Sequence, residues 1–193
     1  DVCSSDLRPV AIQTPLVSNL LDNIANGASK WLCKMDLTDS FFQMLLDSRD
    51  RHLTAFTAPS GELYMFRALP QGLKISPNCF NEMLSKVLGT AGNSENNCQI
   101  YIEDVLLHCK DTRSMLILLA QTLRKLRRAK LKLSPKKCEF FKNQVDFLGL
   151  TISNGTLRIS DKHTRAIRRF PVPKTVRQVR ALLGLVSYCG LFL

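Results

Sequence analysis

Two adjacent acids, Glu103 and Asp104, interrupt the apolar run QIYIEDVLLHC at residues 99–109. A carboxylate is costly to bury unless another group pairs with it or coordinates it. A third acid, Asp36, directly follows the apolar stretch KWLCKM. Neighbouring side chains on a straight strand point to opposite faces. We therefore expect residues 98–109 to form a β-hairpin with its tight turn at Glu103-Asp104, so that both acids can reach one site.

Three carboxylates at the ends of neighbouring strands would make an oxygen-rich site suited to Mg²⁺, which also accepts phosphate oxygens as ligands. Two such ions can activate an attacking hydroxyl and stabilise the leaving oxygen in a displacement at phosphorus. The alternative is that Asp36, Glu103 and Asp104 are ordinary turn and cap acids. Spacing by itself does not separate the two interpretations.

The net charge of +11 is distributed unevenly along the 193 residues. Residues 1–109 carry 8 basic and 12 acidic side chains, whereas residues 110–193 carry 19 basic and 4 acidic ones. This asymmetry indicates that the second half meets a polyanion such as a nucleic acid. A solvated basic helix face would give the same charge, so both interpretations stay open.

Composition narrows the class of protein further. The chain is 45% apolar, which is enough for a sizeable core. It has no apolar run of about 18 residues, so we expect no membrane partner. Its seven cysteines are odd in number and include no C-x-x-C pair, which favours a reducing, intracellular location over secretion and disfavours a disulfide framework or a zinc site.

The elements around the acids follow from hydrophobic periodicity and turn residues. We expect a buried strand at 30–37, two strands within 52–69 around the turn APSGE, and a helix at 77–89 capped by Ser76 with Pro77 at its first position. An amphipathic helix is predicted at 111–130, with one apolar face formed by Leu116, Leu119, Leu123 and Leu126.

The second half continues with short strands over 132–159, including a turn at Asn154-Gly155. Two basic helices are predicted at about 161–169 and 174–190, separated by the sequence PVP. Strands and helices alternate irregularly, which favours an α+β fold over a doubly wound sheet.

Five segments occur in an order that resembles one family. They are MDLTDSFFQMLLD (35–47), LTAFTAPSGELYMFRALPQGLKISPNCFNEML (53–84), YIEDVLL (101–107), KLSPKKCEFF with VDFLGLTIS (132–153), and FPVPKTVRQVRALLGLVSYCGLFL (170–193). Together they resemble the reverse transcriptase domain of gypsy-type LTR retrotransposons, part of a retroviral-like Pol polyprotein, and SDLRPV (5–10) is similar to a further motif of that family. The resemblance implies a right-hand polymerase fold. Residues 1–157 would form fingers and palm, with the N-terminal fingers incomplete, and residues 158–193 would begin the thumb.

The resemblance also implies roles for single residues. Asp36, Glu103 and Asp104 would be the catalytic acids that hold two Mg²⁺ ions, with Mn²⁺ as a possible substitute. Four residues would contact the incoming dNTP: Phe41 as a steric gate against a 2′-OH, Asp39 and Ser40 beside the triphosphate, and Gln71 from the fingers. Phe41 could instead be a core aromatic residue, and the loop that holds Gln71 could be a plain turn.

Template and primer contacts are implied for a second set of residues. Leu148-Gly149-Leu150 resembles the primer grip, Tyr101 precedes the paired acids, and RALLGL resembles a thumb helix in the minor groove of the duplex. In that helix Gly184 would permit close approach, flanked by Arg180 and Tyr188. The alternative for Gly184 is a tolerated helix glycine, at a cost of about 1 kcal/mol.

These expectations describe an RNA-directed DNA polymerase that extends a primer on an RNA or DNA template. Its partners would include the protease, RNase H and integrase domains of the same polyprotein, in a cytoplasmic retroelement particle or the nucleus. Glu103 departs from the family, which has Asp at this position. The extra methylene of Glu shifts the carboxylate by roughly 1 Å. A misplacement of that size can lower the reaction rate by about 10²-fold. A catalytically impaired relic that keeps the fold and binds duplexes is therefore the second hypothesis, and another metal-dependent nuclease or polymerase is the third.

Overall fold

A four-stranded antiparallel sheet forms the centre of the molecule, which is described by a computed structural model for residues 17–26, 29–89 and 97–190. The strand order is β4-β5-β1-β6. The strands are β1 (Trp31–Asp36), β4 (Cys98–Tyr101), β5 (Asp104–Cys109) and β6 (Glu139–Lys142). The strand expected at 30–37 is thus confirmed as β1, in a central position of the sheet.

Both faces of this sheet are covered, because successive side chains of β1 and β5 point alternately to either side. One face, with Met35 and Leu107, packs against α2 (Ser76–Leu88) and α3 (Thr112–Arg128). The other face, with Leu32 and Leu106, packs against α1 (Val17–Asn26) and the strands that follow β6. The helix α1 was not among the sequence predictions, and the fold is α+β as expected.

The β4–β5 hairpin is confirmed, but its turn lies one residue earlier than predicted. Tyr101 pairs with Asp104, so Ile102 and Glu103 form a two-residue loop and Asp104 already belongs to β5. Ile102 adopts a left-handed conformation with φ of 56°. The shift arises because Asp104 also pairs with Asp36 of β1, and pairing on both sides extends β5 by one residue.

The start of α2 differs from the prediction that Ser76 caps it. Ser76 is the first residue of the helix, and the cap position is Ile75, which provides no side-chain cap. The buried Ser76 hydroxyl instead donates a hydrogen bond to the Pro70 carbonyl oxygen over 2.8 Å. Its hydrogen bond therefore holds the loop before the helix.

The helix α3 is present as expected, but only Leu119 and Leu126 of the predicted face contact the core. Leu126 is buried, whereas Leu116 and Leu123 are 54% and 37% exposed. The residues buried beside Leu126 are Met115 and Thr122. Residues 115, 119, 122 and 126 are spaced at intervals of three and four, as are residues 116, 119, 123 and 126, so both sets could form one face of a helix. Packing against α2 and the sheet turns the first set inward. Asp111 caps the helix, since its carboxylate accepts a hydrogen bond from Ser114 N.

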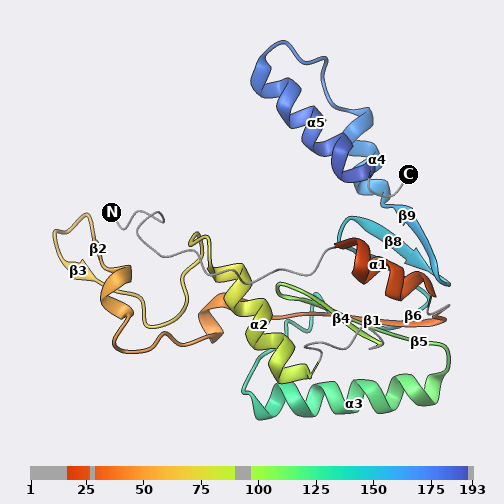
Figure 1. Ribbon diagram of the computed structural model, residues 1–193, viewed down its shortest axis with the longest axis horizontal. Helices are drawn as coiled ribbons and strands as arrows, with labels where there is room; N and C mark the ends of the chain where they lie inside the picture. The colour runs from red at the N-terminus through yellow and green to blue at the C-terminus, as the bar shows by residue number, and fades with distance from the viewer. Residues whose placement is uncertain (1–16, 27–28, 90–96, 191–193) are drawn as a thin grey trace.

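A long excursion follows β1 and extends away from the sheet (Figure 1). It contains two 3-10 helices, η1 (Ser40–Gln43) and η2 (Arg51–Thr54), and a hairpin of β2 (Phe56–Thr57) and β3 (Leu63–Tyr64). The predicted turn at APSGE is confirmed by a hydrogen bond from Ala58 N to Glu62 O. The strands are shorter than expected because residues 51–54 form a 3-10 turn.

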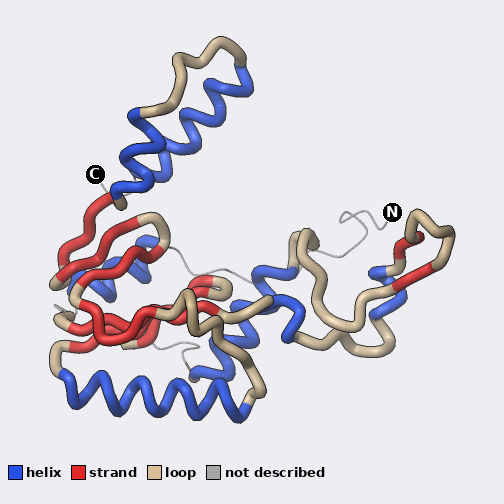
Figure 2. The backbone as a smooth tube through the Cα atoms, turned by 180° about the vertical axis from the view of Figure 1, so that it is seen from behind, coloured by secondary structure: helices blue, strands red, loops and turns tan. Residues whose placement is uncertain are grey.

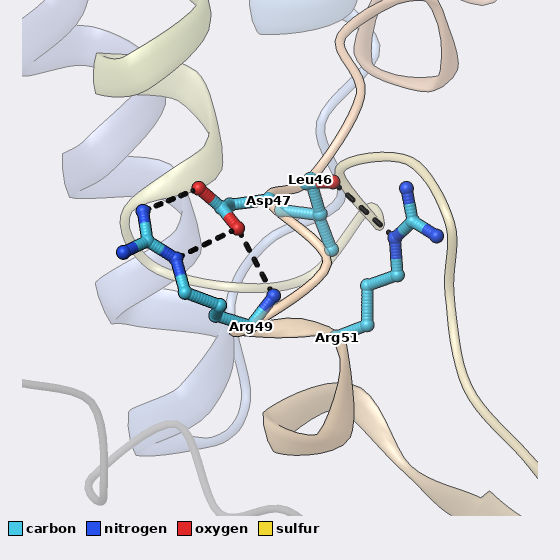
Figure 3. Close-up of polar contacts among 4 residues, drawn as sticks. All are labelled: Leu46, Asp47, Arg49 and Arg51. Atoms are coloured by element: carbon cyan, nitrogen blue, oxygen red, sulfur yellow. Dashed lines mark hydrogen bonds and ion pairs between the residues drawn. The ribbon is translucent and has the colours of Figure 1, made fainter.

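Two arginines stabilise the segment between η1 and η2 (Figure 3). The Arg49 guanidinium forms an ion pair with Asp47 over 2.9 Å, and Arg49 N also donates to the Asp47 carboxylate. Arg51 Nε donates to the Leu46 carbonyl oxygen over 3.3 Å. The Arg49 charge is therefore partly compensated within its own loop.

After β6 the chain forms a three-stranded sheet of β7 (Gln144–Phe147), β8 (Leu150–Ser153) and β9 (Thr156–Ile159). Its two loops, Leu148-Gly149 and Asn154-Gly155, have positive φ at both residues, as two-residue hairpin loops require. The turn expected at Asn154-Gly155 is thus confirmed.

The two basic helices expected at the end of the chain are confirmed as α4 (Asp161–Arg168) and α5 (Val176–Gly190). They project from the body on the side opposite α3, as Figures 1 and 2 show. The basic residues of the second half are therefore divided between two distant places rather than gathered on one surface. No helix in the described part of the chain is long and apolar enough to cross a bilayer.

Candidate active site

The carboxylates of Asp36 and Asp104 belong to residues that lie directly opposite each other on β1 and β5. Tyr101 lies opposite Asp104 on its other side, on β4. These three residues form a row across the end of the central sheet. Directly opposed residues of an antiparallel pair have Cβ atoms about 4.5–5.5 Å apart, and like charges placed there are destabilising. The pairing of two acids in this position therefore calls for a cation.

Electrostatics at the site follow from this arrangement. Burial raises the pKa of the Asp104 carboxyl, and the nearby Asp36 raises it further, while the Lys34 ammonium acts in the opposite direction. Burial also raises the pKa of Glu103, and the charges of Asp104 and Asp36 raise it further. The acids thus carry an unfavourable interaction that a positive ion would relieve.

One oxygen of Asp36 is left without a hydrogen bond. Oδ1 is buried and has no hydrogen-bond partner, and the Lys137 Nζ atom lies 3.3 Å from it in an ion pair. An oxygen with this environment is a suitable ligand for a hard cation. Lys137 was not singled out in the sequence, although its place in the SPKK stretch was part of a matched motif.

The three predicted metal-binding acids lie at the β4–β5 turn and at the facing end of β1. Within residues 17–26, 29–89 and 97–190, no group of three or more His, Cys, Asp or Glu side chains is placed to hold a metal ion. The reason is the position of the turn, which puts Glu103 in the loop while Asp104 stays in the strand. Mg²⁺ is usually bound by one or two carboxylates together with substrate phosphates, so Asp36 and Asp104 fit such an ion. Joint binding by all three acids stays a prediction.

A buried asparagine that sequence reasoning missed positions the turn of these acids. Asn81 of α2 is 4% exposed, and its Oδ1 accepts a hydrogen bond from Ile102 N over 3.0 Å. Ile102 has the left-handed conformation that β-branched residues rarely adopt. Asn81 therefore helps to hold the loop that presents Glu103 and leads into Asp104. An isolated Asn in an amphipathic helix gives no signal of this in the sequence.

The predicted nucleotide-binding residues after β1 lie in and beside η1. Asp39 is exposed and has a φ of 43°, and Ser40 is buried. The Phe41 ring is half-buried and packs edge-on against Phe80 of α2, with centroids 5.6 Å apart. Phe42 is 45% exposed, so the neighbour that contacts the main core is Phe41. A role of Phe41 as a steric gate stays a prediction.

Gln71 belongs to the loop between β3 and α2. It is exposed and lines a hollow of about 220 Å³ whose other walls come from the excursion and from the loop before α2. These walls include Phe56, Phe66 and Pro70. The structure thus places Gln71 beside the excursion, and a contact of Gln71 with the incoming nucleotide stays a prediction.

The predicted primer-grip residues form the loop between β7 and β8. Leu148 and Gly149 are the two loop residues, and the Gly149 carbonyl oxygen accepts a hydrogen bond from Ser160 N. Leu150 is 1% exposed and belongs to the second core. Only the loop residues are therefore accessible to a ligand, and Leu150 supports them from the core.

The predicted duplex-binding residues of α5 lie on a helix that contacts the rest of the structure mainly through α4. Arg180 is exposed, and a Cβ added at Gly184 would meet no heavy atom within 4 Å. Nothing in the described surroundings therefore requires glycine at 184. Tyr188 belongs to α5, but its side chain lies outside the described residues, as do all of residues 5–10.

Comparison with known proteins agrees with this fold. A sequence model of the family "Reverse transcriptase (RNA-dependent DNA polymerase)" matches residues 4–152. The chain is 31% identical over 179 residues to the Retrovirus-related Pol polyprotein from transposon 412 of Drosophila melanogaster, covering 93% of this chain and 14% of that protein. It is 30% identical over 179 residues to the corresponding polyprotein from transposon gypsy of the same organism, covering 93% of this chain and 17% of that protein.

Among solved structures, the foamy viral protease-reverse transcriptase in complex with an RNA/DNA hybrid superposes with a TM-score of 0.81. The identity is 22%, and the match covers 93% of this chain and 24% of that one. This similarity establishes the right-hand polymerase fold. The chain spans about one seventh of the length of the transposon 412 polyprotein.

Proposed function

Because the chain belongs to the reverse transcriptase (RNA-dependent DNA polymerase) family, we propose that it is the polymerase domain of a retrotransposon polyprotein. In this role it extends a primer 3′-OH with dNTPs on an RNA or DNA template. The observation that carries the proposal is the Asp36–Asp104 pair, two opposed carboxylates at the end of a sheet, one of them with a buried oxygen that lacks a hydrogen bond.

Reverse transcriptases use divalent metal ions as a family, and we propose Mg²⁺ here, with Mn²⁺ as a substitute. Asp36 and Asp104 would hold the ion, and Glu103 on the adjacent loop would be the third acid. When bound, such ions lower the pKa of the attacking hydroxyl and neutralise charge on the phosphate. The residues of this chain provide the carboxylates, and the fixed turn at Ile102-Glu103 keeps them at the strand end.

We propose nucleotide and duplex binding for a second set of residues. Phe41, Asp39 and Ser40 follow β1 directly, and Leu148-Gly149 presents an accessible loop. Exposed cations on α4, on α5 and in the loop between them are suited to phosphate contacts that do not read sequence. They include Arg165, Arg168, Lys174, Arg177 and Arg180. Gln71, Tyr101, Gly184 and Tyr188 complete the proposed contacts.

The remaining partners are proposed from the length of the relatives. This chain covers only 14% of the transposon 412 polyprotein. We expect protease, RNase H and integrase domains to accompany it in one polyprotein.

A second candidate function is non-specific binding of template–primer by a catalytically impaired copy. It is favoured by the position of Glu103, which lies in the loop and does not complete a three-residue metal site among the described residues. The basic helices α4 and α5 would still bind phosphates in such a copy.

Primer extension on an RNA template with a DNA primer, in Mg²⁺ and in Mn²⁺, separates these functions. The polymerase proposal expects extension by the wild-type chain, faster extension by Glu103→Asp, and none by Asp36→Asn. The matched control is Asp22→Asn, an exposed acid of α1, which should extend like the wild type. If no protein, wild type included, extends the primer and the chain still binds duplex in a salt-dependent way in an anisotropy assay, the second function would be established instead.

A further inference from the structure

The loop at residues 131–138 is attached to the end of β1, next to the acids. Thr38 N donates to Lys132 O over 3.0 Å, and Ser134 N donates to Asp36 O over 2.9 Å. Lys137 N in turn donates to Ser134 O, which closes a turn within the loop. These backbone bonds determine where the Lys137 side chain starts, directly beside the Asp36 carboxylate.

Lys137 forms an ion pair with that carboxylate. Its Nζ atom lies 3.3 Å from Asp36 Oδ1. The lysine side chain is 69% exposed, whereas the Asp36 side chain is 18% exposed. Since Oδ1 is buried without a hydrogen bond, this ion pair is its direct compensation in the structure. The ammonium also acts on the charges of Glu103 and Asp104.

We propose that Lys137 is the resident cation of the metal-free site, which holds the Asp36 carboxylate in place and withdraws when a divalent ion binds. The inference rests on the proposed function, because it requires Asp36 and Asp104 to be the ligands of that ion. Lys137 and the ion compete for the same oxygen. Lys137 is therefore a positioning residue and not a ligand.

The exposure of Lys137 explains why it can give way. An ion pair in which one partner, here Lys137, is mostly exposed is weakened by solvent and screened by salt. Lysine also carries its charge on a flexible four-carbon stem. A divalent ion placed between Asp36 and Asp104 interacts with both carboxylates. The Lys137 ammonium forms its ion pair with Asp36 Oδ1. Replacement of the lysine by the divalent ion is therefore favoured when phosphate ligands are also present.

Binding of Mn²⁺ to the chain without nucleic acid tests this exchange, with free Mn²⁺ measured by electron paramagnetic resonance. Lys137→Met removes the charge and keeps the length of the side chain. Lys136→Met is the matched control, since Lys136 is exposed and adjacent. We expect Lys137→Met to bind Mn²⁺ about fivefold more tightly than the wild type, the size of a weak ion pair, and Lys136→Met to bind like the wild type.

Thermal unfolding gives an independent readout. In EDTA, Lys137→Met should melt below the wild type and Lys136→Met, because Asp36 and Asp104 then lack their counter-cation, and Mn²⁺ should raise the melting temperature of Lys137→Met the most. Equal Mn²⁺ affinity of all three proteins, with binding still lost in Asp36→Asn, would overturn the role of Lys137 and leave the site intact. Unchanged binding in Asp36→Asn would overturn the proposed site, and the inference with it.

Discussion

Asp36 and Asp104 lie directly opposite one another on adjacent antiparallel strands, although 67 residues separate them in the chain. Two like charges in this position oppose folding, and burial adds to the cost. A fold that keeps such a pair has a use for a cation between the two carboxylates. The functional proposal and the role of Lys137 both follow from this relationship.

Replacing Asp104 by Asn should stabilise the protein at neutral pH. The pKa of this carboxyl is higher in the folded state than in the unfolded chain, so folding favours its protonated form. Ionisation of the carboxyl therefore lowers the free energy of unfolding as pH rises through that pKa. We expect a gain of about 0.5–1 kcal/mol at pH 7 and no gain near pH 3, where the carboxyl is neutral. Urea unfolding at the two pH values measures this, and a variant less stable than wild type at pH 7 would contradict it.

Removing the Asn81 acceptor should loosen the turn at Ile102-Glu103. Asn81→Leu leaves Ile102 N without its partner, which should cost about 1–2 kcal/mol for a part-buried donor. The control is Asn143→Ala, because Asn143 makes an exposed hydrogen bond to Lys30 O and should cost less than about 1 kcal/mol. Chemical denaturation gives the stabilities, and single-turnover extension should slow in Asn81→Leu alone. Equal stability of both variants would refute the role of Asn81.

His108 should make the fold sensitive to acid. Its ring is 2% exposed and lies between Ser29 and Gln99, with Nδ1 3.0 Å from Ser29 Oγ. Burial lowers its pKa from 6.5 to about 4. The unfolded chain therefore takes up the proton first, and the stability present above pH 6.5 is lost as pH falls toward 4, by roughly 3 kcal/mol.

The difference in unfolding free energy between wild type and His108→Gln, followed from pH 7 to pH 4, isolates this contribution. The variant should show the weaker pH dependence. His52→Gln serves as the control because His52 is exposed on η2, and its curve should parallel the wild type. Parallel curves for both variants would exclude His108 as the cause.

Truncation of the two adjacent phenylalanines should lower stability by clearly different amounts. Phe41→Ala removes the ring that packs on Phe80 and should cost about 2 kcal/mol, less than a fully buried Phe. Phe42→Ala, at a 45% exposed position, should cost about 1 kcal/mol. If Phe41 is also the steric gate, only its variant should incorporate rNTPs more readily, which extension with single nucleotides measures. An equal cost for both would contradict the packing described here.

Sequence patterns predicted those features that depend on near neighbours. The hairpins around APSGE and Asn154-Gly155 follow from turn residues, and the helices at 77–89 and 111–130 follow from apolar periodicity with Pro77 at the start of the first. The order of motifs also identified the family and the α+β fold. For the hairpins and helices the information lies within about twenty residues of chain, where spacing and backbone preferences act directly.

Tertiary structure decided the rest, because these features depend on residues far apart in the chain. The turn moved to Ile102-Glu103 since Asp104 pairs with Asp36, and α3 buries Met115 and Thr122 since α2 and the sheet lie there. Glu103 and Asp104 could be singled out as acids from the sequence alone. That Asp104 faces Asp36, that Asn81 holds the loop, and that Lys137 pairs with Asp36 arise only when cross-strand register and loop packing bring these groups together.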